Sequence, residues 1–294
     1  MISILDSRMT RMQPGKNASL EIKNLTTQNE FNDYITQVKS PRLDLEKKFS
    51  AFGRGKKQWA VPGFCEVCEK QTLFYMDWNF SDQQTPNYRE RLVCPSCLLN
   101  NRQRWVMTYL KCALKVLAPT PAVYLFEQTT PFYRWAASRL SNTALIGSEY
   151  LGFAAQPGSL INGIRHEDAM NLSFADASLD VIVSNDVLEH VPVYERALEE
   201  SARVLREKGK LIFSIPFYTN RDETSPRARL EHNAVKLLLP AEYHGPCLVF
   251  HDFGWDLLPA CRRAGFRQAQ MLLYYSPGFG YLGNGCQFIF IAEK

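Results

Sequence analysis

The sequence lacks several features that would point to particular functions. No run of about 18 apolar residues is long enough for a membrane-spanning helix. The first 16 residues lack the sustained apolar core of a secretory signal peptide. Residues 53–57 contain glycine and basic side chains, but no phosphate-binding loop signature follows them. These absences predict a cytoplasmic protein without a membrane partner.

The basic charge is concentrated in the first part of the chain. Residues 1–120 carry 18 Lys and Arg against 11 Asp and Glu, whereas the remainder carries 16 against 19. Hydrophobic residues make up 46% of the chain and charged residues 22%, as in ordinary globular proteins. We expect one large domain or two modest ones, with an acidic partner permitted at the basic end but not required.

The most regular pattern lies in residues 175–217. A short β-branched run, 179–183, indicates a buried parallel strand, and a helix is expected to open at Pro192. Acidic residues near the helix start and basic residues near its end match the helix dipole. Gly209 is expected to provide the left-handed cap, and 211–215 forms the next strand. This stretch predicts one βαβ unit.

The same stretch resembles a known enzyme family. Its sequence D-x-S-x-D-V-I-V-S-N-D-V-L-E-H-V, followed by A-L-E-E-x-x-R-V-L-x-x-x-G-K-L-I-F, is similar to class I S-adenosylmethionine-dependent methyltransferases of the type 11 group. The resemblance implies an α/β fold with a Rossmann-like, seven-stranded methyltransferase sheet. It also implies S-adenosylmethionine as cofactor and methyl transfer as the reaction.

Two CxxC pairs come earlier in the chain. They consist of Cys65, Cys68, Cys94 and Cys97, separated by a gap that suits a β-hairpin built from residues 72–76 and a turn near 81–82. Four thiolates from two such turns are typical of tetrahedral structural zinc, with no coordination position left for substrate. A pair of disulfides, an iron site and a redox CxxC are the alternatives.

The pattern predicts three segments. Residues 1–58 form an amino-terminal arm, irregular through residue 27, and a helical leader interrupted near Pro41. Residues 59–118 form the small four-Cys zinc-ribbon-like module and a linking helix, on which two arginines are expected to be exposed. Residues 119–294 form the methyltransferase domain, with a lid insertion at 217–252. The two arginines are Arg102 and Arg104.

The expected cofactor half departs from the family at one point. The acid after the first strand, Glu127, is normally followed by a glycine-rich turn, but residues 128–133 contain no glycine. The resemblance extends to a bacterial subset of the group that has the CxxC module and shares this turn. It implies a ribose-binding role for Glu149 and an adenine-binding role for Asp168, while helix or turn caps are the alternative. The predicted cofactor-binding residues are Glu127, Thr129, Thr130, Glu149, Asp168, Ala169 and Asn185.

Residues 217–252 form an unusually long connection at the expected carboxyl end of a strand, where loops usually cover sites. Histidine suits a base at neutral pH. We therefore take His190, His244 and Asp186 as candidate catalytic residues. Their structural alternatives are a helix-start hydrogen bond, a loop tether and a cap, respectively.

Three functions are compatible with these patterns. The first is O-methylation of a small-molecule, natural-product or glycan hydroxyl. The second is RNA base methylation with the zinc module as RNA-binding element, although no N-P-P-Y-like tetrad follows the fourth strand. The third is a non-catalytic binding protein with a methyltransferase fold. The sequence leaves the acceptor and the oligomeric state open.

Overall fold

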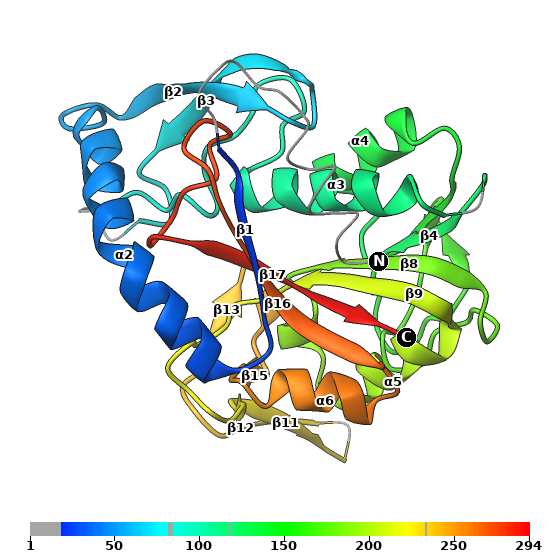
Figure 1. Ribbon diagram of the computed structural model, residues 1–294. Helices are drawn as coiled ribbons and strands as arrows, with labels where there is room; N and C mark the ends of the chain where they lie inside the picture. Colours follow the sequence, from blue (N-terminus) through cyan, green and yellow to red (C-terminus); the bar gives the residue numbers. More distant parts are fainter. Residues whose placement is uncertain (1–18, 82–84, 118, 233) are drawn as a thin grey trace. The chain divides into compact units, whose positions relative to one another are not determined.

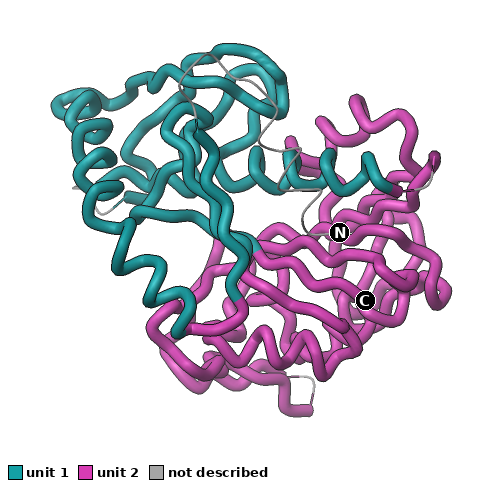
Figure 2. Tube along the Cα trace, in the orientation of Figure 1, with its two compact units in different colours: residues 1–25, 29–116, 272–289 teal, residues 26–28, 117–271, 290–294 magenta. Residues whose placement is uncertain are grey.

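A computed structural model describes residues 19–81, 85–117, 119–232 and 234–294. The chain divides into two compact units (Figure 2). Unit 1 contains the residues up to Leu25, Asn29–Val116 and Leu272–Ile289. Unit 2 contains Thr26–Gln28, Leu117–Met271 and Phe290–Lys294.

A seven-stranded sheet has the order β1-β16-β17-β9-β8-β4-β5 (Figure 1). In this order the strands are Glu21–Leu25, Gln268–Tyr275, Gln287–Glu293, Leu205–Ser214, Leu179–Asn185, Ala122–Leu125 and Ala144–Gly147. Strands β5, β4, β8 and β9 run parallel, whereas β17 pairs antiparallel with β9. The predicted Rossmann-like α/β sheet is confirmed.

Part of the predicted irregular arm is a strand. Residues 1–18 lie outside the described residues, but Glu21–Leu25 form β1 at one edge of the sheet. Only Leu25 of this strand is fully buried. A five-residue edge strand with so few buried side chains leaves almost no hydrophobic pattern, so the prediction was wrong here.

The βαβ unit matches expectation except at its joint. Helix α5 spans Tyr194–Val204, and β9 begins at the next residue, so Gly209 is not the helix cap. Lys208 adopts the left-handed conformation instead, with φ 65°. A Cβ at Gly209 would lie 2.7 Å from the backbone oxygen of Arg206 and 3.2 Å from that of Asp180. A side chain at Gly209 would therefore clash with the backbone near the start of β9.

Two further helices of unit 2 are α4, Pro131–Arg139, and α6, Leu257–Arg263. The shorter elements are η1 Leu188–His190, β6 Leu160–Ile161, β7 Ile164–Arg165, β10 Ser225–Pro226, β11 Ala228–Glu231, β12 Ala234–Leu237, β13 Tyr243–His244, β14 Cys247–Leu248 and β15 His251–Asp252. These strands form two-stranded antiparallel pairs: β6 with β7, β10 with β15, β11 with β12 and β13 with β14.

The predicted break at Pro41 is wrong. Helix α2 runs from Gln28 to Ala51 with the proline inside it. The next residue, Arg42, is almost buried and donates hydrogen bonds to the Gly285 carbonyl at 2.9 Å and to the Glu21 carboxylate at 2.6 Å. Such tertiary contacts outweigh the backbone hydrogen bond that proline removes from a helix.

Unit 1 also contains the hairpin and the linking helix. Strands β2, Gln58–Cys65, and β3, Lys70–Asp77, pair antiparallel, so the first CxxC is itself the hairpin turn. The predicted strand 72–76 is correct, but its partner precedes the cysteines. The predicted linking helix is present as α3, Asn101–Leu114, and it begins with a capping box between Asn100 and Gln103.

The two arginines of α3 are buried, against expectation. Arg104 is 0% exposed and donates to the backbone oxygens of Phe279 and Gly280 at 2.7 and 2.9 Å. Its guanidinium also lies 4.0 Å from the centre of the Phe74 ring. Arg102 pairs with Glu90. Local sequence could not show the partners of Arg104, because its backbone acceptors at Phe279 and Gly280 are distant in the chain.

No helix in the described ranges combines the length and the apolar character that a bilayer crossing requires.

Candidate cofactor and acceptor site

Three parallel strands deliver the predicted cofactor residues to one edge of the sheet. The register pairs Leu125 of β4 with Val183 of β8 and with Gly147 of β5. Glu127 and Glu149 follow the carboxyl ends of β4 and β5, and Asn185 is the last residue of β8. In open α/β sheets this edge is where ligands bind.

Glu127 connects two of the predicted residues. Its Oε1 accepts a hydrogen bond from Asn185 Nδ2 at 2.6 Å, and its Oε2 accepts one from the Thr130 hydroxyl. Thr130 also caps α4 by accepting from the Tyr133 amide at 3.2 Å, with Pro131 in the first turn. The expected helix start after the glycine-free turn is therefore present. Glu127, Thr130 and Asn185 form one hydrogen-bonded group.

Glu149 holds the glycine-free turn itself. Its Oε1 accepts hydrogen bonds from the Gln128 amide, the Thr129 amide and the Thr129 hydroxyl, each at 2.8 Å. Its Oε2 accepts none from the residues that the structure describes, and the side chain is half-buried. One carboxylate oxygen therefore shapes the turn, while the other remains available to a ligand.

Asp168 and Ala169 occupy a separate turn. Asp168 Oδ1 accepts from the Met170 amide at 2.9 Å, which is the turn-capping arrangement. The backbone of Glu167 next to it joins the edge of the sheet, since its amide donates to the Glu149 carbonyl at 3.2 Å. The structure therefore connects the Asp168 turn to the Glu149 strand end through the backbone.

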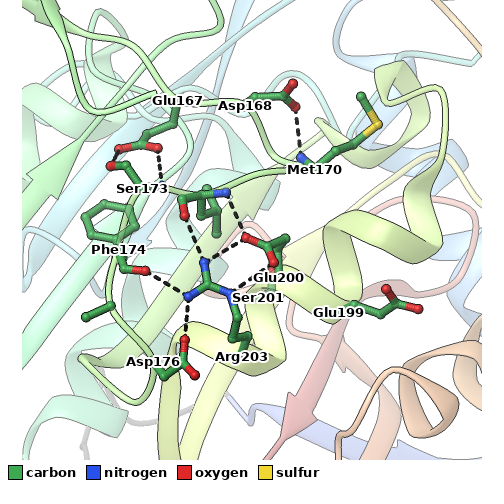
Figure 3. A network of polar contacts seen from close by, with 12 residues as sticks. Glu167, Asp168, Met170, Ser173, Phe174, Asp176, Glu199, Glu200, Ser201 and Arg203 are labelled. Carbon is green, nitrogen blue, oxygen red and sulfur yellow. Dashed lines mark hydrogen bonds and ion pairs between the residues drawn. The ribbon is translucent and has the colours of Figure 1, made fainter. Parts of the chain in front are cut away.

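A polar network fastens the chain after Asp168 to helix α5 (Figure 3). Glu200, 3% exposed, accepts from the Leu172 amide at 2.9 Å and pairs with Arg203 at 2.8 Å. Arg203 also donates to the backbone oxygens of Leu172 and Phe174 at 2.8 and 2.9 Å and pairs with Asp176 at 2.6 Å. The position of the Asp168 turn thus depends on charged residues of α5.

Sequence reasoning missed Tyr150, which follows Glu149 directly. Its side chain is 60% exposed, and its ring centre lies 5.5 Å from that of His166. Burial and the nearby Asp168 carboxylate raise the pKa of the Tyr150 hydroxyl. The sequence signal was a tyrosine directly after the predicted ribose-binding acid, Glu149.

The catalytic candidates gather around a residue that was not predicted, Glu189. Its side chain is fully buried, and its Oε1 lies 3.7 Å from His190 Nε2 and 3.6 Å from His244 Nδ1. The contact with Glu189 raises the pKa of His244, and the charge of Asp186 adds to this effect. Asp186 has φ 51° and accepts from the Ser214 hydroxyl at 3.1 Å. The structure brings all three candidates to the carboxyl end of β8.

The arginines of residues 217–252 are engaged in ion pairs. Arg227 pairs with Asp252 at 3.0 Å and with Glu242 at 3.1 Å, and Arg221 pairs with Asp252 at 3.0 Å. At the end of this segment the His251 ring contacts the backbone oxygens of Val191 and Pro192. These contacts hold the segment near the chain that follows β8.

The four cysteines of unit 1 converge as expected. Their sulfurs lie within 4.8 Å of one another, with Cys65–Cys97 and Cys68–Cys94 separations of 3.9 Å. A tetrahedral zinc with Zn–S bonds of about 2.3 Å separates its sulfurs by about 3.8 Å. All eight cysteines lie in the described part of the chain and are free thiols, so no disulfide competes for these sulfurs. The donor set fits zinc.

Part of the chain is similar to known proteins. Residues 135–213 match the family model described as a methyltransferase domain, in agreement with the resemblance noted in the sequence. The arsenite methyltransferase of Aquipseudomonas alcaligenes is 30% identical over 131 residues, covering 43% of this chain and 35% of that protein. The chain thus spans about a third of the length of this curated relative.

Two solved structures are among those found similar to this chain. The 1,6-didemethyltoxoflavin-N1-methyltransferase of Burkholderia thailandensis, solved with S-adenosylhomocysteine, is 17% identical, covering 65% of this chain and 77% of its own, with a TM-score of 0.37. An S-adenosylmethionine-dependent methyltransferase of Mesorhizobium loti is 16% identical, covering 63% and 96%, with a TM-score of 0.36.

The α5 network leads to a prediction for Glu200→Gln. Hydrogen bonds from Arg203 lower the pKa of Glu200 below its usual value of 4.5. The ionised Glu200 carboxylate therefore stabilises the folded state above about pH 4.5. This stabilisation is lost as the pH falls through the lowered pKa of Glu200 in the folded state. We expect Glu200→Gln to reduce the free energy of unfolding by about 1–3 kcal/mol at neutral pH. The difference from wild type should shrink on acidification.

Denaturant titrations at several pH values would measure this effect. Glu199→Gln is the matched control, because Glu199 is the neighbouring, half-exposed acid and pairs only with Arg196 among the described residues. Equal unfolding free energies for the two variants at neutral pH would contradict the role assigned to Glu200.

Proposed function

We propose that the protein is an S-adenosylmethionine-dependent methyltransferase with its cofactor at the carboxyl ends of β4, β5 and β8. The observation that carries the proposal is the arrangement of Glu127, Glu149 and Asn185 at this edge, beside the capped start of α4. The match of residues 135–213 to the methyltransferase domain supports it independently.

We assign the ribose, the adenine and the methionine end of the cofactor to different residues. We assign the ribose hydroxyls to Oε2 of Glu149, which accepts no hydrogen bond from the described residues, since a carboxylate readily accepts from hydroxyls. Asp168, with Ala169, is assigned to the adenine, and the start of α4 with Thr129 and Thr130 to the methionine end. Glu127 and Asn185 support the region between them.

Cofactor binding tests the assignment of Glu149. Replacing Glu149 with alanine removes the ribose acceptor and the partner of the Gln128 and Thr129 amides. We expect S-adenosylhomocysteine to bind about 10- to 100-fold more weakly, as the loss of one to two charge-assisted hydrogen bonds implies.

Isothermal titration calorimetry with S-adenosylhomocysteine would measure this loss. Glu207→Ala is the control, because Glu207 is an exposed acid on β9. Undetectable binding to the wild-type protein would exclude the enzyme and would equally exclude a cofactor-binding role without catalysis.

For the acceptor, we propose O-methylation of a small-molecule, natural-product or glycan hydroxyl. Residues 217–252 bring His244 next to His190 at the strand end, with ring centres 5.3 Å apart. We assign this segment as the acceptor lid, and Asp186, His190 and His244 as the residues that orient the acceptor oxygen and receive its proton.

Transfer from methyl-labelled cofactor tests the acceptor class. Hydroxylated metabolite and glycan fractions should become labelled, and His244→Ala should abolish most of the incorporation. Labelling of RNA instead, with binding that weakens as salt is raised, would favour the RNA base methyltransferase and contradict the proposed acceptor.

We further propose that Cys65, Cys68, Cys94 and Cys97 hold a structural zinc ion. Four thiolates complete a tetrahedral shell, so the ion would stabilise unit 1 and take no part in methyl transfer. Two basic residues of the amino-terminal part, Arg102 and Arg104, are buried and bonded within the chain, so these two are not available to a nucleic-acid partner.

Replacing Cys68 with serine should lower bound zinc by one equivalent per chain and destabilise unit 1. Elemental analysis and thermal unfolding followed by circular dichroism would measure both effects. Cys112→Ser is the matched control, because Cys112 is a half-buried free thiol outside the cluster. Unchanged zinc content in Cys68→Ser would contradict the site.

A further inference from the structure

A second group of metal-binding side chains lies in unit 2, apart from the four cysteines. Glu189 and His190 close the η1 turn after β8, and His244 ends β13. One ligand atom from each residue lies within 4.8 Å of the other two. Two imidazoles and one carboxylate are a common ligand set for zinc and other divalent transition metals.

The Glu189 carboxylate lacks the partners that a buried charge requires. The side chain is 0% exposed, and neither of its oxygens accepts a hydrogen bond from the described residues. Buried charges are normally paired, hydrogen-bonded or bound to metal.

The separations around Glu189 suit ligands better than a direct hydrogen bond. Its Oε1 lies 3.6 Å from His244 Nδ1 and 3.7 Å from His190 Nε2. Hydrogen bonds to oxygen require about 2.7–3.2 Å. Ligand atoms on a tetrahedral ion with bonds of about 2.0–2.1 Å lie about 3.3 Å apart. Both separations from Glu189 are close to this value, and the ligand atoms of the two histidines lie within 4.8 Å of each other.

The outer contacts of both histidines also match metal ligation. His190 Nδ1 contacts the Leu248 backbone oxygen at 2.8 Å, so it carries the proton and leaves the Nε2 lone pair toward Glu189. The second ring nitrogen of His244, Nε2, faces the Glu242 carboxylate at 3.7 Å. Metal-binding histidines usually give their other N–H to a carbonyl or carboxylate in this way.

We propose that Glu189, His190 and His244 bind one divalent transition-metal ion, with the remaining coordination position open to an oxygen of the acceptor. Three protein ligands leave such a position, as in catalytic zinc sites, and the cluster lies beside Asp186 at the carboxyl end of β8. With the ion bound, the lone pairs of both histidines are occupied, so Asp186 is the group left to receive the acceptor proton. The role toward the acceptor rests on the proposed methyltransferase function. The metal site itself does not.

Metal titration of the full-length, tag-free protein tests the site. The cysteine cluster is first loaded with zinc, excess metal is removed by gel filtration, and Co²⁺ is then added in a calorimeter. We expect one further equivalent of Co²⁺, with an absorption spectrum that lacks thiolate-to-cobalt bands. Glu189→Gln and His190→Asn should each weaken this binding at least tenfold.

Two further variants make the test specific. Glu242→Gln keeps the three ligands but weakens the outer contact of His244 and the ion pair with Arg227, and it should weaken Co²⁺ binding about tenfold. His232→Ala removes an exposed histidine outside the cluster and should leave binding unchanged. Circular dichroism confirms that each variant is folded.

The outcomes are distinct. Absence of a further Co²⁺ equivalent in the wild-type protein, or its persistence in both Glu189→Gln and His190→Asn, would overturn the site. Loss of binding in His232→Ala would show surface capture and would also overturn it. S-adenosylhomocysteine titration of the same samples separates this result from the proposed function, because cofactor binding does not require the three ligands.

Discussion

The parallel pairing of β8 with β4 on one side and β9 on the other is the constraint on which the site depends. The registers Leu125 with Val183, and Asn185 with Ser214, bring the strand ends to a common edge. Because these strands are almost fully buried, a slip of one residue would turn their side chains to the opposite face. The hydrophobic core therefore sets the positions of the polar residues that follow each strand.

The first turn, residues 128–133, needs no glycine to lie at this edge of the sheet because the Glu149 side chain holds it in place. The Glu149 carboxylate accepts from two successive turn amides, which a glycine-rich turn would leave to the ligand. The position where neighbouring atoms lie too close for a side chain is instead Gly147. A Cβ there would lie 2.4 Å from the Tyr133 ring and 2.6 Å from the Glu127 carbonyl oxygen. The glycine needed for close packing thus lies at the end of β5.

Local sequence was sufficient for the elements whose determinants are adjacent in the chain. Strand β8, helix α5 and strand β9 follow from hydrophobic runs, and the start of α4 follows from Thr130 and Pro131. The continuity of α2 through Pro41 could not be predicted, since Arg42 contacts Gly285 243 positions later.

The candidate site residues also divide into those that local sequence could predict and those that depend on distant contacts. Glu127, Glu149 and Asn185 were predictable because each follows or ends a recognisable strand. Glu189 stands beside His190 in the sequence, but its burial and its proximity to His244 arise only when the segment of residues 217–252 folds back to the end of β8. Its chemical importance depends on desolvation, which composition and spacing do not report.

The contrast between Glu149 and Glu189 explains why the two acids suit different tasks. Glu149 is half-buried, and its Oε1 accepts three hydrogen bonds from the glycine-free turn, so its charge is compensated without a ligand. Glu189 is buried with both oxygens unbonded among the described residues and two imidazoles just beyond hydrogen-bond distance. A compensated carboxylate can bind and release a neutral ribose, whereas an uncompensated one favours a cation. This difference in compensation is the physical basis on which we propose Glu149 for a reversible cofactor contact after β5 and Glu189 for a metal site after β8.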